Sequence, residues 1–427
     1  MEYTKKEIKK GINLHTIKNE KFKTNLIAVF LTTELTKENV TKNALLPAIL
    51  RRGTEQMQSQ EEISKTLEEM YGATFDCGID KKGDNQILKF YLESINDEYL
   101  PNENENILEK SIKVLFEIIF NPKLEKDHFK TEYINQEKQN LKQIINGKMD
   151  NKSRYAYERC IEEMYKNQSY GLYKYGYVED LEKIDETKLY SYYQNLINEC
   201  KIDIFISGNI EKNIEKNIEK NIEENKVIKN LKEREPKFIK ESEKNKNETE
   251  EIKTVEEKME VVQGKLIIGL DLKIKDEKSK YTSLIYNSIL GGSATSKLFQ
   301  NVREKNSLAY TASSSLLKNK NNIFINCGIE IKNYEKALEI IKEQLEDLKQ
   351  GKFTKEEVEN AKKGIIAAIK VIDDEQDTEI IYYFGQEFQE KKTSLKEYEE
   401  IIKNITRQDV IDVANKVNIN TIYFLRN

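Results

Sequence analysis

The chain has 427 residues, of which 38% are hydrophobic and 34% are charged. This length exceeds what a single hydrophobic core usually serves, so at least two domains are predicted. The 70 Lys and Arg residues against 75 Asp and Glu residues leave a net charge of −5. That balance argues against nucleic-acid binding, which needs a clustered basic excess. No apolar run reaches the roughly eighteen residues that span a membrane, and the polar start predicts no signal peptide. We therefore expect a cytoplasmic protein that binds neither nucleic acid nor membrane.

The first half of the chain mixes strand and helix patterns. An apolar strand is predicted at residues 25–31, and Ser59 with Glu62 forms the capping box of a helix. Two strands follow, at 74–79 and 86–93. Apolar residues at helical spacing then mark a long amphipathic helix: Ile107, Leu108, Ile112, Leu115, Phe116 and Ile119. Strands and long helices that do not alternate singly predict the α+β class, with helices layered on an antiparallel-rich sheet.

The second half repeats this plan. Three pairs of segments match in the same order: 25–31 with 265–272, 122–129 with 351–358, and 202–206 with 421–425. Because the matches keep their order, we predict two duplicated α+β halves, at residues 1–208 and 258–427.

Residues 209–257 are predicted to be a charged, low-complexity linker between the halves. They begin with repeats of Asn-Ile-Glu-Lys and continue as a tail rich in Lys, Glu and Asn. Isoleucines recur every four residues: Ile210, Ile214, Ile218 and Ile222. A four-residue period drifts around a 3.6-residue helix and buries little surface. We predict a solvated linker that is helical in patches; a partner-binding helix is the alternative.

Side chains that bind metal are scarce. Catalytic zinc needs three protein ligands, usually His with a carboxylate or Cys. The two histidines, His15 and His128, are too far apart in sequence to share a helix face, and both are predicted to be ordinary core or surface residues. The four cysteines lack a CxxC spacing, which indicates buried thiols of a reducing compartment: Cys77, Cys160, Cys200 and Cys327.

The string SKLFQNVREKNSLAY, from Ser296 to Tyr310, resembles the Arg/Tyr motif of the insulinase-like zinc peptidases, a family that includes pitrilysin, insulinase and mitochondrial processing peptidase. The resemblance covers nearly the whole chain and implies two α+β halves that face each other across a cavity. It implies that Arg303 binds a substrate carbonyl and that Tyr310 donates a hydrogen bond to the oxyanion of the tetrahedral intermediate. The alternative is that Arg303 is a surface helix residue and Tyr310 begins an ordinary strand.

The segment that matches the family's zinc-binding His-x-x-Glu-His helix is degenerate. Aligned on the Gly-Thr pair that follows it, the two His positions fall on Ala44 and Ala48, and the Glu position falls on Pro47. The family's third ligand, a Glu, aligns near Ile144. The resemblance therefore implies a scaffold that has lost its metal, with no cofactor of its own. A proline inside a helix removes a hydrogen bond and clashes with the preceding turn, so we expect a kink or a helix start near Pro47.

An aromatic, Gly-containing string at residues 170–177 resembles the family's loop that leads to the cavity, and we expect it to pack there. Two further strings, ALLP at 44–47 and LEEMYGAT at 67–74, resemble the non-peptidase members of Gram-positive bacteria. That group is encoded next to an active paralogue and is associated with elongation factor P modification.

These resemblances imply a catalytically inactive subunit. In small bacterial members two chains pair to close the cavity; one supplies zinc and the general base, and its partner can supply Arg and Tyr. We predict that this chain pairs with a paralogous His-x-x-Glu-His peptidase, which alone holds zinc, and helps to bind a peptide or unfolded polypeptide. The alternatives are a stand-alone peptide-binding or structural assembly scaffold, and an active metallopeptidase with unusual ligands.

Overall fold

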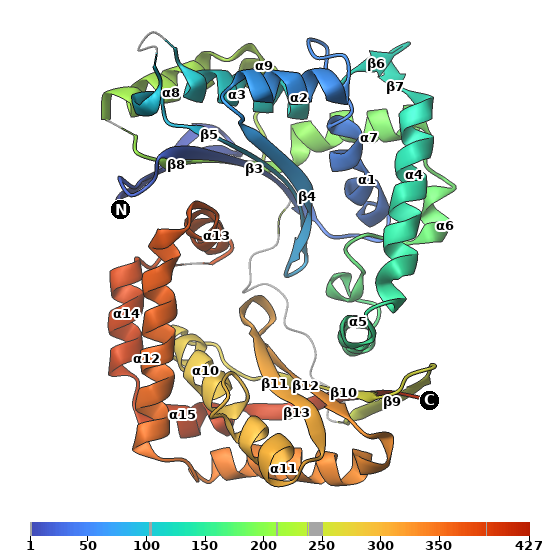
Figure 1. Cartoon of the computed structure of the whole chain (residues 1–427), viewed down its shortest axis with the longest axis vertical. Coiled ribbons are helices and arrows are strands. Elements are labelled where there is room, and N and C mark those ends of the chain that lie inside the picture. The colour runs from blue at the N-terminus through green and yellow to red at the C-terminus, as the bar shows by residue number, and fades with distance from the viewer. Residues whose placement is uncertain (1, 102–104, 211, 237, 239–250, 390) are drawn as a thin grey trace. The chain divides into compact units, whose positions relative to one another are not determined.

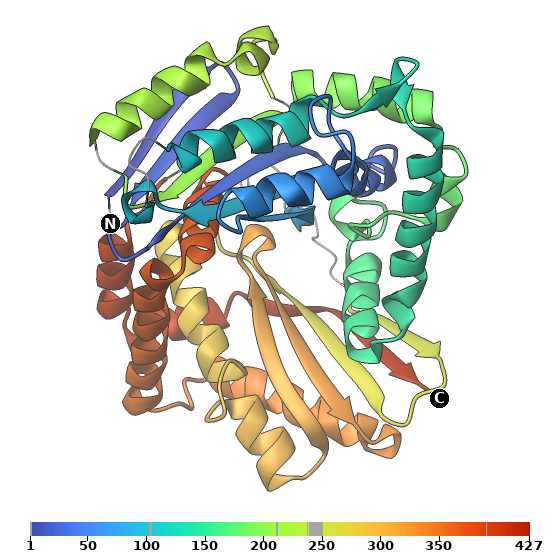
Figure 2. The ribbon, with the colours of Figure 1, turned by 45° about the horizontal axis from the view of Figure 1, so that its top comes forward.

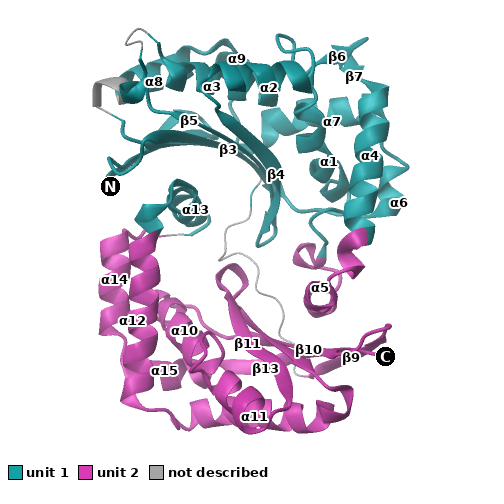
Figure 3. Cartoon of the chain, viewed as in Figure 1, with its two compact units in different colours: residues 1–146, 172–240, 372–390 teal, residues 147–171, 241–371, 391–427 magenta. Residues whose placement is uncertain are grey.

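The computed structural model describes residues 2–101, 105–210, 212–236, 238, 251–389 and 391–427, with the side chains of 212–215 excepted. The chain forms two compact units (Figures 1 and 3). Unit 1 comprises residues 1–146, 172–240 and 372–390, and unit 2 comprises residues 147–171, 241–371 and 391–427. Each unit therefore contains a segment from the opposite half of the sequence.

Unit 1 is built on a six-stranded mixed sheet in the order β1-β2-β8-β3-β5-β4. The strands are β1 (Glu2–Lys9), β2 (Ile12–Lys18), β3 (Thr24–Glu34), β4 (Thr74–Lys82), β5 (Asn85–Ile95) and β8 (Lys201–Gly208). β2 and β8 run parallel, and the other neighbouring strands run antiparallel. Every residue of β8 is buried, so this central strand is covered on both faces.

Helices form a layer on one face of this sheet (Figures 1 and 2). The longer ones are α1 (Val40–Leu50), α2 (Gln60–Glu69), α3 (Ile107–Phe120), α4 (Thr131–Asn146) and α7 (Glu186–Glu199). Further elements of unit 1 are α6 (Val178–Leu181), α8 (Lys212–Glu224), α9 (Lys226–Asn230) and the ribbon of β6 (Leu124–Glu125) and β7 (His128–Phe129). The predicted cap of α2 is confirmed at Ser59, which accepts from the N–H of Glu62. The Glu62 carboxylate, however, accepts from the N–H of Gln58 and not from that of Ser59.

Unit 2 has a five-stranded sheet in the order β11-β12-β10-β13-β9. Its strands are β9 (Lys253–Lys258), β10 (Gly264–Leu272), β11 (Ala309–Leu317), β12 (Asn322–Ile329) and β13 (Val417–Arg426). Its helices include α10 (Glu277–Leu290), α11 (Tyr334–Lys349), α12 (Lys355–Val371), α14 (Leu395–Asn404) and α15 (Arg407–Ala414). As in unit 1, one strand pair is parallel, here β9 with β13.

The predicted duplication is confirmed by the strand order. Strands β9, β13, β10, β12 and β11 of unit 2 follow the same order and directions as β2, β8, β3, β5 and β4 of unit 1. The predicted strands at 25–31 and 265–272 lie in β3 and β10, and those at 202–206 and 421–425 lie in β8 and β13. The α+β class, with two duplicated halves of sheet layered with helices, is therefore correct.

Two helices are exchanged between the halves. α5 (Lys152–Met164) follows α4 in the chain but belongs to unit 2, and α13 (Gln376–Gln386) follows α12 but belongs to unit 1. Figure 3 shows each of these helices in the colour of the unit that receives it. α5 buries Ala156 and Cys160 with sheet residues of unit 2, and α13 buries Ile380 and Phe384 with sheet residues of unit 1. Because α5 and α13 hold equivalent places in the duplicated order, the exchange is reciprocal.

A buried ion network fastens the end of α13 to the sheet of unit 1. The carboxylate of Glu387 accepts from Lys201 Nζ at 2.9 Å and from Lys5 Nζ at 2.6 Å. Lys201 also binds Asp203 at 2.8 Å. The side chains of Lys201, Asp203 and Glu387 are 7%, 0% and 5% exposed, so two ammonium groups and two carboxylates neutralise each other in a low-dielectric site.

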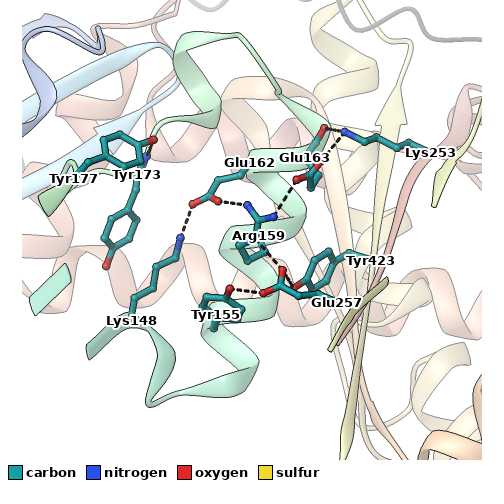
Figure 4. Close-up of polar contacts among 10 residues, drawn as sticks. All are labelled: Lys148, Tyr155, Arg159, Glu162, Glu163, Tyr173, Tyr177, Lys253, Glu257 and Tyr423. Carbon is teal, nitrogen blue, oxygen red and sulfur yellow. Dashed lines mark hydrogen bonds and ion pairs between the residues drawn. The ribbon is translucent and has the colours of Figure 1, made fainter. Parts of the chain in front are cut away.

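A second polar network fastens α5 to the sheet of unit 2 (Figure 4). Arg159 of α5 binds Glu257 of β9 at 3.1 Å, and the Tyr155 hydroxyl donates to the same carboxylate at 2.5 Å. One turn further along α5, Glu163 binds Lys253 of β9 at 2.7 Å. These contacts join a helix of the first half to a strand that begins the second.

The predicted linker has structure at both ends. α8 and α9 pack on unit 1, where Ile218 and Ile222 are buried in the core. The expectation that this repeat buries little surface is therefore wrong. The repeat lies against an apolar surface of unit 1, so isoleucines that drift around the helix still contact the core. Its other end, residues 253–257, belongs to β9. The side chain of Ile214 and residues 239–250 lie outside the described residues. None of the helices described combines the length and apolar character needed to cross a membrane.

Loss of the Glu387 charge should destabilise the protein. In Glu387→Gln the buried Lys201 loses one of its two anions, and breaking a buried pair in this way costs about 3 to 5 kcal/mol. Urea unfolding measures the change. The control is Glu400→Gln, because Glu400 is 65% exposed and pairs with Lys403 on the surface, where about 0 to 1 kcal/mol is expected. Equal effects of the two substitutions would contradict a stabilising role for the network.

His15 lies on the other side of Asp203 in this network. Its Nε2 is 3.1 Å from Asp203 Oδ1, and the Tyr3 hydroxyl is 2.9 Å from its Nδ1. Because a carboxylate only accepts, Nε2–H donates to Asp203 and Nδ1 accepts from Tyr3. Burial lowers the pKa of His15 below 6.5, although Asp203 and Glu387 oppose the shift. The imidazole is therefore neutral in the folded protein near neutral pH.

Acidification should destabilise the protein through His15. The unfolded chain binds a proton on this residue near pH 6.5, whereas the folded chain resists protonation. The stabilisation is therefore complete above pH 6.5 and is lost as the pH falls toward the lower folded pKa. The free energy of unfolding should fall in this window by at most about 1.4 kcal/mol per pH unit, and His15→Gln should remove that dependence. Urea unfolding of both proteins between about pH 5 and about pH 8 tests this; parallel curves would refute it.

Candidate functional site

The degenerate zinc motif lies on α1. Ala44 and Ala48 are half-buried on this helix, and Pro47 is buried. α1 begins at Val40 and continues through Pro47 to Leu50, so a helix start at Pro47 is wrong. Apolar neighbours on the same helix pack into the core of unit 1 and offset the backbone cost of the proline: Leu45, Leu46, Ile49 and Leu50. Where the family has two imidazoles and a carboxylate, this helix has apolar groups.

The aligned third ligand offers no replacement. Ile144 lies on α4, which packs against α1, and it is 48% exposed. The carboxylate of Glu137, also on α4, is buried and bound by Arg52 just after α1 at 2.5 Å. The structure therefore brings the four aligned positions onto two neighbouring helices without a metal ligand among them.

Within the described residues, one cluster has the composition of a metal site. His15, Asp203 and Glu387 offer ligand atoms within 4.8 Å of one another. The ammonium of Lys201 binds both carboxylates, at 2.8 and 2.9 Å, and so takes the position of a cation. The three side chains therefore form an ion network with Lys201. His15 is thus the core residue that the sequence predicts, and the half-buried His128 bonds through Nδ1 to the carbonyl of Phe129.

The thiols are inert. Cys160, Cys200 and Cys327 are buried and Cys77 is half-buried, all without disulfides. Burial raises the pKa of each of the four thiols to about 12, so none forms a thiolate near neutral pH.

The Arg/Tyr string lies in unit 2 and projects both side chains outward. Residues Phe299–Lys305 form a π-helix, a rare conformation that is frequent at functional sites. The guanidinium of Arg303 lies over the ring of Phe299, 4.5 Å from its centroid. Tyr310 stands near the start of β11 and is 64% exposed.

A tight turn links the π-helix to β11. Ser307 has a left-handed φ of 51°, and its N–H donates to the carbonyl of Arg303 at 3.0 Å. The N–H of Leu308 donates to the carbonyl of Val302 at 3.1 Å, and both of these side chains are buried. The turn is therefore anchored on two sides, which restricts the motion of Arg303 and Tyr310 relative to the sheet.

The aromatic loop packs on the first turn of α1. Gly176 has a φ of 75°, and a Cβ there would collide with Thr41. The N–H of Tyr177 donates to Thr41 Oγ1 at 3.1 Å. The loop thus supports the helix that carries the degenerate motif.

A groove in unit 1 was not foreseen from the sequence. It has a volume of about 460 Å³ and lies between α13 and the edge of the sheet at β4 and β5. Three carboxylates and one ammonium line it: Asp76, Glu93, Asp377 and Lys89. The alternation of polar and apolar residues along β4 and β5 could have indicated that one face of these strands is polar. Nothing in the sequence indicates that α13, from the other half, forms the opposite wall.

The fold and its degenerate helix define a peptidase-like protein that lacks the zinc-binding side chains. A family model described as the peptidase M16 inactive domain matches residues 183–365. The "Probable inactive metalloprotease YmfF" of Bacillus subtilis (strain 168) is 34% identical over 417 residues, covering 97% of this chain and 96% of that protein. The chain therefore belongs to the M16 peptidase family, as a homologue of its inactive members.

Two further similarities bear on its role. The "Uncharacterized zinc protease YmxG" of the same Bacillus subtilis strain is 28% identical over 170 residues, covering 39% of this chain and 38% of that protein. The crystal structure of a conserved protein from Enterococcus faecalis superposes with a TM-score of 0.89 at 26% identity, covering 100% of this chain and 99% of that one. The two-unit fold is thus shared over the full length.

Rebuilding the motif should not create a zinc peptidase. In the variant Ala44→His, Pro47→Glu, Ala48→His, the new glutamate replaces a buried residue, where an unpaired carboxylate is costly. The third ligand would still be missing at Ile144. We expect no stoichiometric zinc in the wild type by elemental analysis, and no peptide hydrolysis by either protein. A quadruple variant that also carries Ile144→Glu supplies a carboxylate at the third position. Comparing it with the triple variant separates the effect of the missing third ligand from that of the missing helix motif. Chelator-sensitive hydrolysis by the triple variant would refute this account.

Proposed function

We propose that this protein is a catalytically inactive subunit that pairs with a paralogous zinc peptidase and helps to position its peptide substrate. One observation carries the proposal. Arg303 and Tyr310 are exposed on an anchored turn, in a chain whose aligned zinc positions are Ala44, Pro47 and Ala48. A chain without the metal cannot use these two side chains by itself, whereas a partner that holds zinc could.

The chemistry of the two side chains fits this role. A phenol donates one hydrogen bond and a guanidinium donates several, and fixed donors aimed at a developing oxyanion lower the barrier to acyl transfer. Zinc held by the partner would activate the attacking water. Tyr310 and Arg303 would contribute only orientation and charge stabilisation, which require that both side chains be held rigidly.

The relatives of this chain support a pair of paralogues. Bacillus subtilis has one relative named as a probable inactive metalloprotease and another named as a zinc protease. We extend this arrangement to the present chain and place the pair in the cytoplasm. The strings at 44–47 and 67–74 are our reason to include it in the group associated with elongation factor P modification.

The groove between α13 and β4 supports a role in peptide binding. β4 is an edge strand, so its outer N–H and C=O groups can pair with an added strand. The carboxylates of Asp76, Glu93 and Asp377 outnumber the ammonium of Lys89, and Ile381 is 49% exposed beside them. The same groove favours the second candidate function, a stand-alone peptide-binding scaffold, which needs neither Arg303 nor Tyr310.

The two candidate functions predict different activities when the hydrogen-bond donors of Arg303 and Tyr310 are removed. The chain is co-purified with the paralogous His-x-x-Glu-His peptidase of its own organism, and peptide hydrolysis by the complex is measured. Tyr310→Phe and Arg303→Ala should each lower turnover by about a hundredfold, with complex formation unchanged. Tyr71→Phe, at an exposed tyrosine of unit 1, is the matched control and should leave turnover unchanged. Full activity of both variants would show that the two donors are not needed and would favour the scaffold role. Failure of the two chains to associate would overturn the partner role.

A further inference from the structure

A second groove of unit 1 lies between the first turn of α1 and one side of α7. Its volume is about 870 Å³, within the range of small-molecule sites. Its lining carries four ammonium groups and two carboxylates: Lys37, Lys42, Lys183 and Lys188 against Glu38 and Asp180. The lining residues alone therefore carry two more positive than negative charges, and two carboxylates outside the lining, Asp185 and Glu179, also pair with Lys188 and Lys37.

Short polar side chains line the side of this groove formed by α7. Thr187, Ser191 and Asn195 are spaced four residues apart, which places them on one face of the helix. All three are exposed, and they offer two hydroxyl donors and one amide donor.

Buried hydrogen bonds hold the aromatic wall of the groove in place. The Tyr192 hydroxyl donates to Asn43 Oδ1 at 2.7 Å, and Asn43 Nδ2 donates to Gln86 Oε1 at 2.9 Å. Gln86 Nε2 in turn donates to the carbonyl of Val40 at 3.0 Å. Since Asn43 and Gln86 are 0% exposed, this chain of bonds fixes the ring of Tyr192 relative to α1.

Among the described residues that line this groove, Lys42 is the lysine without an ion-pair partner. Its ammonium lies 4.3 Å from the centroid of the Tyr192 ring, and no ion pair joins it to a carboxylate among the described residues. Burial lowers the pKa of Lys42, and Glu38 only partly opposes the shift. The other lysines are paired with carboxylates: Lys37 and Lys183 with Asp180 at 2.9 and 3.1 Å, and Lys188 with Asp185 at 2.7 Å. A bound anion would give the ammonium of Lys42 a partner of opposite charge.

The donor types favour a phosphate group as that anion. An ammonium binds phosphate as a point charge and needs no arginine beside it, and no arginine is among the residues that line this groove. A phosphate has enough acceptor oxygens for an ammonium and two hydroxyls together. The groove is also larger than a single phosphate, and the Tyr192 ring and Ile184 give it apolar surface for an organic part.

We propose that this groove binds a small organic phosphate, with the phosphate group at Lys42 and the hydroxyls of Thr187 and Ser191. The site belongs to unit 1 alone and does not depend on the proposed partner role. Lys42 lies two residues before Ala44, so an occupied groove would brace the first turn of the helix that carries the degenerate motif.

Isothermal titration calorimetry of the full chain with ADP and with inorganic pyrophosphate tests the proposal. Lys42→Met keeps the length of the side chain and removes its charge, and it should weaken binding of both probes about tenfold, because a hydrogen bond to a charged group is lost. Ser191→Ala should weaken binding by a smaller factor. The matched control is Lys65→Met, at an exposed lysine of α2, which should leave affinity unchanged. Thermal unfolding of each variant verifies that the fold is intact.

The outcomes separate the parts of the proposal. Tighter binding of ADP than of pyrophosphate supports an organic phosphate as the ligand. Equal binding of the two probes, lost in Lys42→Met, supports the phosphate site and overturns the organic part. Absence of binding, or equal losses in Lys42→Met and Lys65→Met, would reveal only non-specific attraction of anions to lysines and would overturn the site.

Discussion

The pairing of Lys201 with Glu387 is the interaction on which unit 1 depends. A buried ammonium is costly unless an anion lies beside it, and one of its two anions comes from residues 372–390 of the opposite half. The same segment covers the aromatic face of the sheet, where Phe384 stacks on Phe30 at 4.1 Å between centroids. Unit 1 therefore cannot complete its core until nearly the whole chain has been synthesised, which makes the two halves one cooperative protein.

Unit 2 receives α5 through contacts of a different character. The anchor of α5 at Glu257 is partly exposed, and ion pairs of that kind contribute little stability. Apolar burial of Ala156, Cys160 and Ile161 supplies most of the attraction. The charges determine where the helix sits: Arg159 and Glu163 each meet the opposite charge on β9. Both exchanged helices thus bury apolar side chains. α13 is in addition held by buried ion pairs, whereas the ion pairs of α5 are partly exposed.

The positions of α1 that align with the family's zinc motif carry no side chain that could bind a metal. At the positions aligned with the two imidazoles and the carboxylate, α1 has the half-buried Ala44 and Ala48 and the buried Pro47, so these positions are apolar. The Arg/Tyr string has polar side chains at Arg303 and Tyr310, a π-helix and an anchored turn. Apolar side chains at one site and an exposed donor pair at the other are the two observations on which the proposed subunit role rests.

The sequence by itself determined the α+β class, the duplication and the absence of a His pair, because these depend on local periodicity and on residue type. It did not reveal the exchange of α5 and α13, since the pattern of an amphipathic helix does not indicate which sheet its apolar face will cover. Nor did it show that Ile218 and Ile222 would be buried, that Glu387 would neutralise Lys201, or that Lys42 would stand unpaired against Tyr192. Each of these depends on pairing residues far apart in the chain. Only the tertiary structure decided them, because desolvation and charge compensation are properties of the assembled surroundings.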